Sequence, residues 1–589
     1  MCGIIGIVAP SCGEREQAAV VAGLVTLAQR GPDAEGLLVF PHSILGHRRL
    51  SIIDIAGGAQ PMKDSGGNLA ITFNGEIYNY KKLRAALEKA GHTFRTQSDT
   101  EVILEAYRAY GQKCVDHFDG MFAFAIWDES KQKLFLARDR FGEKPLYYAH
   151  SGNTFLFASE IKALLATELI KQKLDLVSLD NYLSLSYIPP WRTAYADIQT
   201  LPPAHHAVFK NGVITQTRYW QLHQRPLTVS QEEAAETVRT MLAESVKSRL
   251  VADVEVGAFL SGGIDSSIVT TLAQEAMRTR KIKTFSAGFE DFINELPYAE
   301  EIAYKLGANH HPTHIRLDLV EALRDTAGYF DEPFADSSNI PVHLLSQFAR
   351  KHVSVVLAGD GGDELFFGYG HYRRHWHLPL KQKLHRLLSD PFEYFPAHLP
   401  QYFSPRERTE LWKDSSAVER DLATHLDLSE AKTNLQKINL IDFQLILPGD
   451  ILTKVDRSSM MHSLEVRSPF LQHELAEFVY NLPDDYKTNR TQGKLLLAHA
   501  FKDLIPAHFF TRKKQGFGAP IKEWLKKPDI QKLVETVGTP GTRLGLLIHE
   551  KNVRSIVEAY QRGNDHLARR VWTLLTLELW MQSHPGVTL

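Results

Sequence analysis

Two patterns of apolar residues follow each other along the chain. In the first 220 residues, short runs of aromatic and branched residues alternate with turn signals, as half-buried strands require; the clearest runs are 69–73, 121–128 and 133–138. Two segments, 80–90 and 100–110, carry apolar residues at helical spacing and would cover a sheet. This part of the chain is therefore predicted to be an α+β fold with antiparallel strand pairing.

The pattern changes after Tyr219 and Trp220. The stretch 223–231 is polar, contains a proline and is interpreted as a linker. Beyond it, buried-strand candidates alternate with helical segments, in the order 254–260, 266–279, 282–289, 299–306 and 353–357. Such alternation predicts an α/β fold with a parallel sheet wound on both sides, followed beyond Tyr372 by a mostly helical extension with an aromatic cluster at 392–395. We therefore expect two domains, 1–220 and 232–589.

Composition narrows the class of partner. The chain has 589 residues, too many for one hydrophobic core, and 67 basic against 69 acidic residues leave a net charge of −2. This balance gives no global attraction for nucleic acid or anionic membranes, so neither is expected as a partner and a small substrate is favoured. Three cysteines are too few for a disulfide framework, which favours a reducing, cytoplasmic location. We expect neither a signal peptide nor a membrane anchor, because no apolar stretch approaches about 20 residues.

Cys2 is the first candidate for chemistry. Removal of Met1 would leave a thiol and a free α-amino group on one residue, and that amine can act as general base for its own side chain. Asn74 and Gly75 offer an amide and an open backbone N–H for an oxyanion hole, although Asn-Gly alone is more often a turn. Arg49 is suited to holding an α-carboxylate and Asp99 an α-ammonium. Taken singly, Cys2 would be incidental and each charge a surface residue.

Two further segments indicate a nucleotide site. The string SGGIDSS, 261–267, joins a buried strand to a helix and offers backbone N–H groups to an anion, with Asp265 in reach of a magnesium ion. It lacks the Gly-Lys-Ser/Thr of a Walker loop. The string AGDGGDE, 358–364, follows another strand and should lie at the same sheet edge, where Asp360, Asp363 and Glu364 favour magnesium over calcium. A plain glycine-rich turn and a solvated acidic turn are the alternatives.

The first 220 residues resemble the class II glutamine amidotransferase domain. The matching strings are MCGIIGI, RGPDAEG, HRRLSIID, FNGEIYN, SDTEVIL, DGMFAFAIWD and RDRFGEKPLYY. The resemblance implies an N-terminal-nucleophile (Ntn) fold of two sandwiched sheets between helical layers, with Cys2 as nucleophile and Asn74 and Gly75 as oxyanion hole. It also implies that glutamine is held by Arg49, Leu50, Ser51, Ile52, Ile53, Asn74, Gly75, Glu76 and Asp99.

The second half resembles the N-type ATP pyrophosphatases, and the whole chain is similar to the asparagine synthetase family. The carrying strings are SGGIDSS, FSAGF, DEPFADSS, AGDGGDELFFGY, DRSSMMHSLEVRSPFL and QGKLLL. The resemblance implies Mg²⁺ at Asp265 and Asp363, an acid-base role for Asp360 and Lys494 facing the phosphates and the acyl-adenylate. It implies ATP contacts at Leu260, Ser261, Gly262, Gly263, Asp265, Ser266, Ala287, Ala358 and Gly359.

The expected activity is glutamine hydrolysis, passage of ammonia to the second site, and amidation of an adenylated aspartate. Two departures bear on the acceptor: Asp360 stands where the family often has Glu, and Gln472 where it usually has Asp. Another carboxylate, such as a cell-wall diaminopimelate or a sugar uronate, therefore stays open as the acceptor. A β-lactam-forming relative is disfavoured by the intact Cys2, Asn74 and Asp99, and a non-catalytic interaction protein is the remaining alternative. The assembly is left open, with a homodimer as one expectation.

Overall fold

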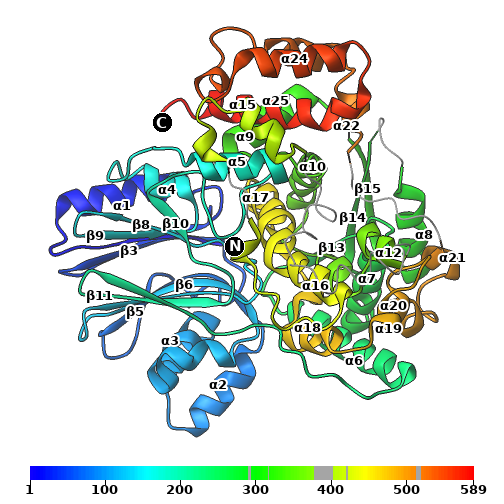
Figure 1. The fold of residues 1–589 in the computed structure, drawn as a ribbon. Coiled ribbons are helices and arrows are strands. Elements are labelled where there is room, and N and C mark those ends of the chain that lie inside the picture. The colour runs from blue at the N-terminus through cyan, green and yellow to red at the C-terminus, as the bar shows by residue number, and fades with distance from the viewer. Residues whose placement is uncertain (290–293, 316, 377–401, 419–421, 512–518, 589) are drawn as a thin grey trace.

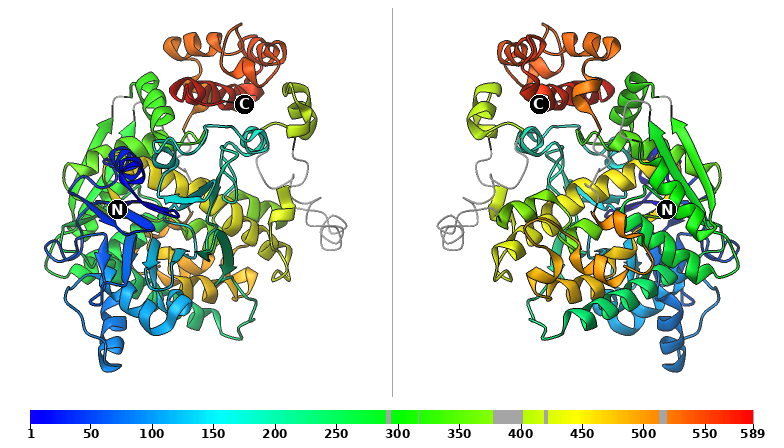
Figure 2. Two further views of the ribbon diagram at one scale, coloured as in Figure 1. Left: turned by 90° about the vertical axis from the view of Figure 1, so that its left-hand side faces the viewer. Right: turned by 90° about the vertical axis from the view of Figure 1, so that its right-hand side faces the viewer.

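The computed structural model describes residues 1–589 except 290–293, 316, 377–401, 419–421, 512–518 and 589. The predicted aromatic cluster at 392–395 lies outside the described residues. Figure 1 shows two stacked sheets on its left side, a third sheet on its right side, and the C-terminal helices above both. Figure 2 shows the same arrangement from the two sides.

Two antiparallel sheets form the first part of the chain. In the described residues, one sheet has the order β10(Ile198–Thr200), β8(Tyr147–Ser151), β9(Thr154–Ala158), β1(Gly3–Val8), β3(Ser43–Arg49), β2(Ala34–Val39). The other has the order β12(Val213–Arg218), β11(His205–Lys210), β7(Lys133–Arg138), β6(Gly120–Asp128), β5(Leu69–Ile77), β4(Met62–Lys63). The runs predicted at 69–73, 121–128 and 133–138 are thus β5, β6 and β7.

Strand periodicity separates the layers. Along β6, Phe122, Phe124 and Ile126 join the core under helices α2(Tyr80–Lys89) and α3(Asp99–Tyr110). The intervening Ala123 and Trp127 join the core between the two sheets, as successive strand residues must point to opposite faces. Helices α1(Glu14–Thr26) and α4(Ile161–Leu165) cover the outer face of the other sheet (Figure 1). The predicted sandwich of two sheets between helical layers is confirmed.

The third sheet is parallel throughout. Its order is β15(Asn309–Ile315), β14(Lys283–Phe289), β13(Val256–Phe259), β16(Val355–Leu357), β17(Glu465–Arg467). On β16, Val355 and Leu357 face a core with helices α6(Gln231–Arg249), α7(Ile264–Met277) and α8(Leu296–Leu306). Val356 faces the opposite core, with α10(Asn339–Arg350) and α17(Leu452–Met460). Helices on both faces confirm the predicted doubly wound sheet.

The described residues beyond Tyr372 are mostly helical, as predicted. Helix α25(Ala568–Ser583) is buried along most of its length and shares a core with α5(Leu176–Leu185) and α9(Leu319–Tyr329). A π-helical stretch, 442–451, leads directly into α17. The remaining described helices include α11(Gly362–Leu365), α12(Gly370–Trp376), α15(Pro405–Leu411), α16(Asn434–Ile441), α18(His473–Tyr480), α19(Asp484–Lys487), α20(Leu495–Ala500), α21(Ala507–Thr511), α22(Ile521–Trp524), α23(Pro528–Thr536) and α24(Glu550–Gln561). None of the helices in the described residues is long and apolar enough to cross a membrane.

Candidate active sites

Cys2 stands immediately before strand β1 and is buried. Its backbone N–H donates to Oδ1 of Asn74 at 3.0 Å, and its Sγ lies 3.9 Å from the carbonyl oxygen of Leu50. Met1 precedes it, and the Met1 amino group pairs with Oε2 of Glu465 at 3.1 Å. Burial raises the pKa of the Cys2 thiol, while the nearby Met1 ammonium acts to lower it. The thiol therefore depends on neighbouring charge for its activation.

Asn74 and Gly75 lie together near the end of β5, beside Cys2. Because Asn74 Oδ1 accepts from Cys2, its Nδ2 points the other way, and this buried atom has no hydrogen-bond partner among the described residues. Gly75 has φ of +151°, and a Cβ there would lie 2.1 Å from the carbonyl oxygen of Met121. Only glycine fits this position. The Gly75 backbone therefore lies beside the Asn74 amide with no side chain of its own.

The expected glutamine-binding residues surround the same place. Arg49 donates to the carbonyl oxygens of Ile53, Asp54 and Ile55 at 3.1, 2.7 and 2.9 Å, which leaves it further N–H donors. Burial raises the pKa of Asp99 to about 6. The other expected residues are held by their own contacts: Ser51 N–H donates to Asp33, the Ile52 carbonyl accepts from Asp253, and Glu76 pairs with Arg467 at 3.4 Å.

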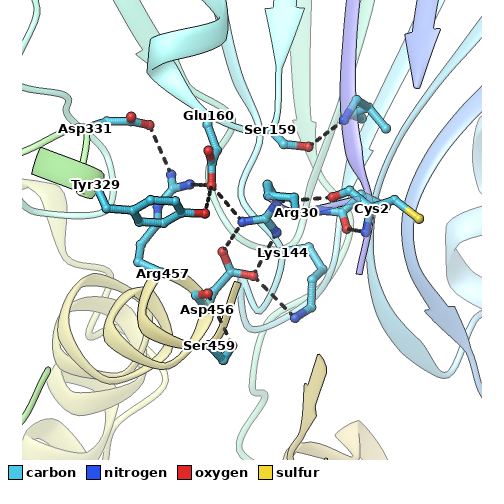
Figure 3. A network of polar contacts seen from close by, with 12 residues as sticks. Cys2, Arg30, Lys144, Ser159, Glu160, Tyr329, Asp331, Asp456, Arg457 and Ser459 are labelled. Atoms are coloured by element: carbon cyan, nitrogen blue, oxygen red, sulfur yellow. Dashed lines mark hydrogen bonds and ion pairs between the residues drawn. The ribbon is translucent and has the colours of Figure 1, made fainter. Parts of the chain in front are cut away.

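A buried ion network joins the nucleophile to the other half of the chain (Figure 3). Arg30 Nε donates to the carbonyl oxygen of Cys2 at 3.1 Å. Its two terminal nitrogens bind Asp456 at 2.7 and 3.0 Å, and Nη1 also binds Glu160 at 3.0 Å. Glu160 in turn pairs with Arg457 at 2.6 Å. Asp456 and Arg457 belong to α17, so the third sheet's half of the chain is linked through Arg30 to the backbone carbonyl of Cys2. The network extends to Lys144, Lys162 and Asp331.

A second polar centre forms around Lys494, at the carboxyl edge of the parallel sheet. Lys494 Nζ binds Oδ2 of Asp265 and lies 2.8 Å from Oδ1 of Asp363. These three residues come from the N-terminus of α20, from α7 and from α11, and the structure brings them together. The two carboxylates raise the pKa of the Lys494 ammonium despite its burial. Lys494 therefore stays cationic.

The two glycine-rich loops fit tightly against each other. A Cβ at Gly359 would lie 2.9 Å from Asp265 Cβ, and a Cβ at Gly362 would lie 2.8 Å from Asp265 Cγ. The second loop can therefore pack directly against Asp265 of the first only because these two residues are glycines. Leu260 N–H donates to Phe285, and Ser261 Oγ lies 3.1 Å from Ser266 Oγ. The other expected ATP residues follow the same edge: Gly262 and Gly263 open α7, Ala287 belongs to β14, and Ala358 directly follows β16.

Asp360 lies between the carboxylates that bind Lys494 and a second lysine, Lys454. Burial raises its pKa to about 6, Lys454 acts to lower it, and the charges of Asp265 and Asp363 raise it further. Lys454 itself binds Oδ2 of Asp336 at 2.9 Å. Lys454 is on α17, so one helix touches both the neighbourhood of Asp360 and the network that reaches Cys2.

The family model described as asparagine synthase matches residues 237–582. The chain belongs to the asparagine synthase family. A second model, described as glutamine amidotransferase domain, matches residues 1–220. The chain is 33% identical to "Asparagine synthetase [glutamine-hydrolyzing] 1" of Bacillus subtilis, over 98% of this chain and 96% of that protein. It is 33% identical to asparagine synthetase 3 of the same organism, over 86% of each chain.

The chain is less similar to the solved structures that it matches than to these sequence relatives. The structure titled as the allosteric regulatory enzyme of purine biosynthesis shares 17% identity, covers 54% of this chain and 69% of its own, and has a TM-score of 0.30. A TM-score at this level supports no inference about this chain.

Several residues that connect the two centres were missed in the sequence. Arg30 and Asp456 lie within family strings, RGPD and DRSS, but 426 positions separate them, and nothing in a single sequence pairs them. Gln472, one of the two departures from the family pattern, lies at the N-terminus of α18. Its Oε1 accepts from the N–H of Leu475 and its Nε2 donates to Glu474, so its side chain caps α18 in place of the usual Asp.

Proposed function

We propose that this asparagine synthase family protein is a glutamine-dependent asparagine synthetase, in which residues 1–220 release ammonia from glutamine and residues 232–589 amidate aspartate. The observation that carries the proposal is that one chain contains two separate centres, one around a thiol and one around a buried lysine. Cys2 stands beside the Asn74 amide, whose Nδ2 has no partner among the residues that the structure describes, and Lys494 stands between two carboxylates at the edge of a parallel sheet.

In the first reaction, the Cys2 thiolate attacks the γ-amide carbon of glutamine and ammonia leaves from the resulting tetrahedral species. Asn74 Nδ2 is the donor suited to the developing oxyanion, because it is buried and uses no other partner in the described structure. Removal of Met1 would convert the Cys2 backbone nitrogen into an amine that activates the thiol. Water then hydrolyses the γ-glutamyl thioester. Arg49 and Asp99 are proposed to bind the substrate's α-carboxylate and α-ammonium.

In the second reaction, the aspartate β-carboxylate attacks the α-phosphorus of ATP and pyrophosphate leaves. In this proposal Lys494 follows the negative charge that develops on the phosphates, and Asp360 takes up the proton released when ammonia displaces AMP. ATP would lie against the loop 260–266 and residues 287, 358 and 359, where backbone N–H groups open helix α7.

The donor set also fits a magnesium ion. Asp265 and Asp363 converge on a single cation, the Lys494 ammonium, and Mg²⁺ is commonly held by one or two carboxylates together with substrate phosphates. Bound there, the ion would offset the charge of the triphosphate. In the part of the chain that the structure describes, no three His, Cys, Asp or Glu side chains are grouped to hold a metal by themselves.

An apolar contact between the halves supports direct transfer of ammonia. Met1, Tyr78 and Met121 pack together with Met460, which ends α17. Removal of Met1 would clear the space that it fills between Cys2 and the second half. A passage lined by the remaining apolar side chains would keep ammonia unprotonated, which is the form that can attack an acyl-adenylate.

The test is pyrophosphate release from Mg-ATP with a panel of carboxylates: aspartate, glutamate, diaminopimelate and a hexuronate. We expect aspartate to support release and asparagine to form with glutamine or ammonium as nitrogen source. Release with diaminopimelate or the uronate alone would replace aspartate by that acceptor, and no release with any would favour an interaction protein.

The three thiols are unpaired, which supports the cytoplasmic location proposed.

A further inference from the structure

The backbone of Cys2 is held at both ends. Its N–H donates to Asn74, on β5 of the facing sheet in the same half, and its carbonyl oxygen accepts from Arg30. The next anchor is the N–H of Ile4, which donates to Ser159 Oγ at 3.0 Å (Figure 3). Because Cys2 precedes β1 and is outside its ladder, these contacts fix the backbone from which the thiol projects.

Arg30 cannot hold this orientation alone. Its side chain is fully buried, and a planar guanidinium takes its direction from the carboxylates that it binds. Asp456 binds it with two parallel hydrogen bonds of 2.7 and 3.0 Å, the geometry that fixes both the plane and the position of the group. Arg30 and Lys144 hold the pKa of the Asp456 carboxyl well below its usual range, so the pair stays charged.

The contact between Arg30 and Asp456 joins the two halves of the chain. Arg30 and Glu160 belong to the half that carries Cys2, whereas Asp456 and Arg457 project from α17 of the other half. Lys454, two residues before Asp456 on the same helix, binds Asp336, and its charge acts on Asp360. Helix α17, which borders the proposed amidation site, therefore also orients the Arg30 guanidinium, and that group holds the backbone of Cys2.

We propose that Asp456 is a positioning residue for the glutaminase reaction: through Arg30 it holds Cys2 in its reactive orientation. The inference rests on the proposed hydrolysis of glutamine at Cys2. Glu160 would still neutralise Arg30 if the Asp456 charge were lost, so the guanidinium would remain buried and paired but would turn toward Glu160. Glutamine itself touches neither residue in this scheme, so the effect should fall on kcat for hydrolysis and not on KM.

The first experiment measures glutamine hydrolysis and ammonium-supported amide synthesis by the full chain. We expect Asp456→Asn to lower kcat for glutamine at least tenfold with KM changed less than twofold, and to leave ammonium-supported synthesis within about threefold. Asp456→Glu, which keeps the charge, should recover part of the loss. Equal kcat in Asp456→Asn and wild type would overturn the inference, as would a parallel fall in both activities.

A matched control tests whether any buried ion pair would do the same. Asp180 binds Arg408 at 3.0 Å, both side chains are buried, and neither belongs to the network at Cys2. Asp180→Asn should therefore leave kcat for glutamine near that of the wild type even where it lowers the unfolding temperature. A loss of glutaminase kcat equal to that of Asp456→Asn would reduce the effect to general destabilisation.

The second experiment asks whether Asp456 acts through Arg30. Arg30→Gln should lower kcat for glutamine at least as much as Asp456→Asn, and the double variant should lose no more than Arg30→Gln alone. Losses that multiply would show independent roles and overturn the inference. A wild-type protein that does not hydrolyse glutamine would instead refute the proposed function, before any comparison of variants.

Discussion

Replacing Lys494 with Met tests the proposed adenylation site most directly. The Lys494 side chain is 7% exposed, and its ammonium lies 2.8 Å from Oδ1 of Asp363 while also binding Asp265. At an effective dielectric of about 20, a charge pair at that distance interacts by about 6 kcal/mol before desolvation is counted. Met keeps the length of the stem but removes this charge. Lys494 has φ of +57°, and Met would share that strain, so the backbone contribution is unchanged.

The rate effect is smaller than the gross charge interaction. Removing one preorganised electrostatic group from a transition state typically costs about 3 kcal/mol. This corresponds to a loss of more than about a hundredfold in rate. We therefore expect Lys494→Met to lower amide synthesis by at least that factor with either glutamine or ammonium, because the adenylation step serves both. Glutamine hydrolysis at Cys2 should continue without producing amide.

The assay is pyrophosphate release from Mg-ATP with the accepted carboxylate, followed in parallel with glutamate formation. Lys502→Met is the matched control, since Lys502 is an exposed lysine shortly after α20 and should retain activity. Retained glutamate formation and an unfolding temperature near that of wild type would show that Lys494→Met is folded. Near-normal pyrophosphate release by that folded variant would refute the role of Lys494.

Three further outcomes follow from the same assignment. Cys2→Ala should abolish glutamine-dependent synthesis and spare ammonium-supported synthesis; wild-type use of glutamine by this variant, measured as glutamate formed, would exclude Cys2 as the nucleophile. Asp265→Asn should cripple pyrophosphate release while glutamine hydrolysis persists, and equal loss of both would contradict a local metal role. Burial raises the pKa of Asp99 to about 6, so its carboxylate is lost as pH falls through that value, and kcat/KM for glutamine should fall below pH 6. This inflection should be missing in the pH profile of Asp99→Asn.

The sequence predicted the elements whose pattern is local. Strands β6 and β7 were found nearly to the residue, because each has several buried apolar residues flanked by turns. Strand β17 was missed: it has three residues, two of them charged, and Glu465 and Arg467 are buried there only because they pair with each other and with Met1 and Glu76. Such a strand cannot be predicted from hydrophobicity, since partners far along the chain make its burial favourable.

The same limit applied to the candidate sites. Cys2, Asn74, Asp265 and Lys494 were found because each belongs to a recognisable string, and the structure brings Cys2 to Asn74 and Lys494 to Asp265. No string reveals that Arg30 binds Asp456, because the pairing exists only once the two halves dock.

Burial of so many charges between the halves is better explained by specificity than by stability. A buried ion pair recovers its desolvation cost only with good geometry and added hydrogen bonds, and apolar replacements of such pairs are often neutral or stabilising. An apolar interface could hold the halves together in several registers, whereas Arg30, already paired with Glu160 of its own half, gains its two hydrogen bonds to Asp456 in one register only. The correct register also fixes the carbonyl group of Cys2. We therefore infer that the network is retained because correct docking of the two halves then also aligns the nucleophile.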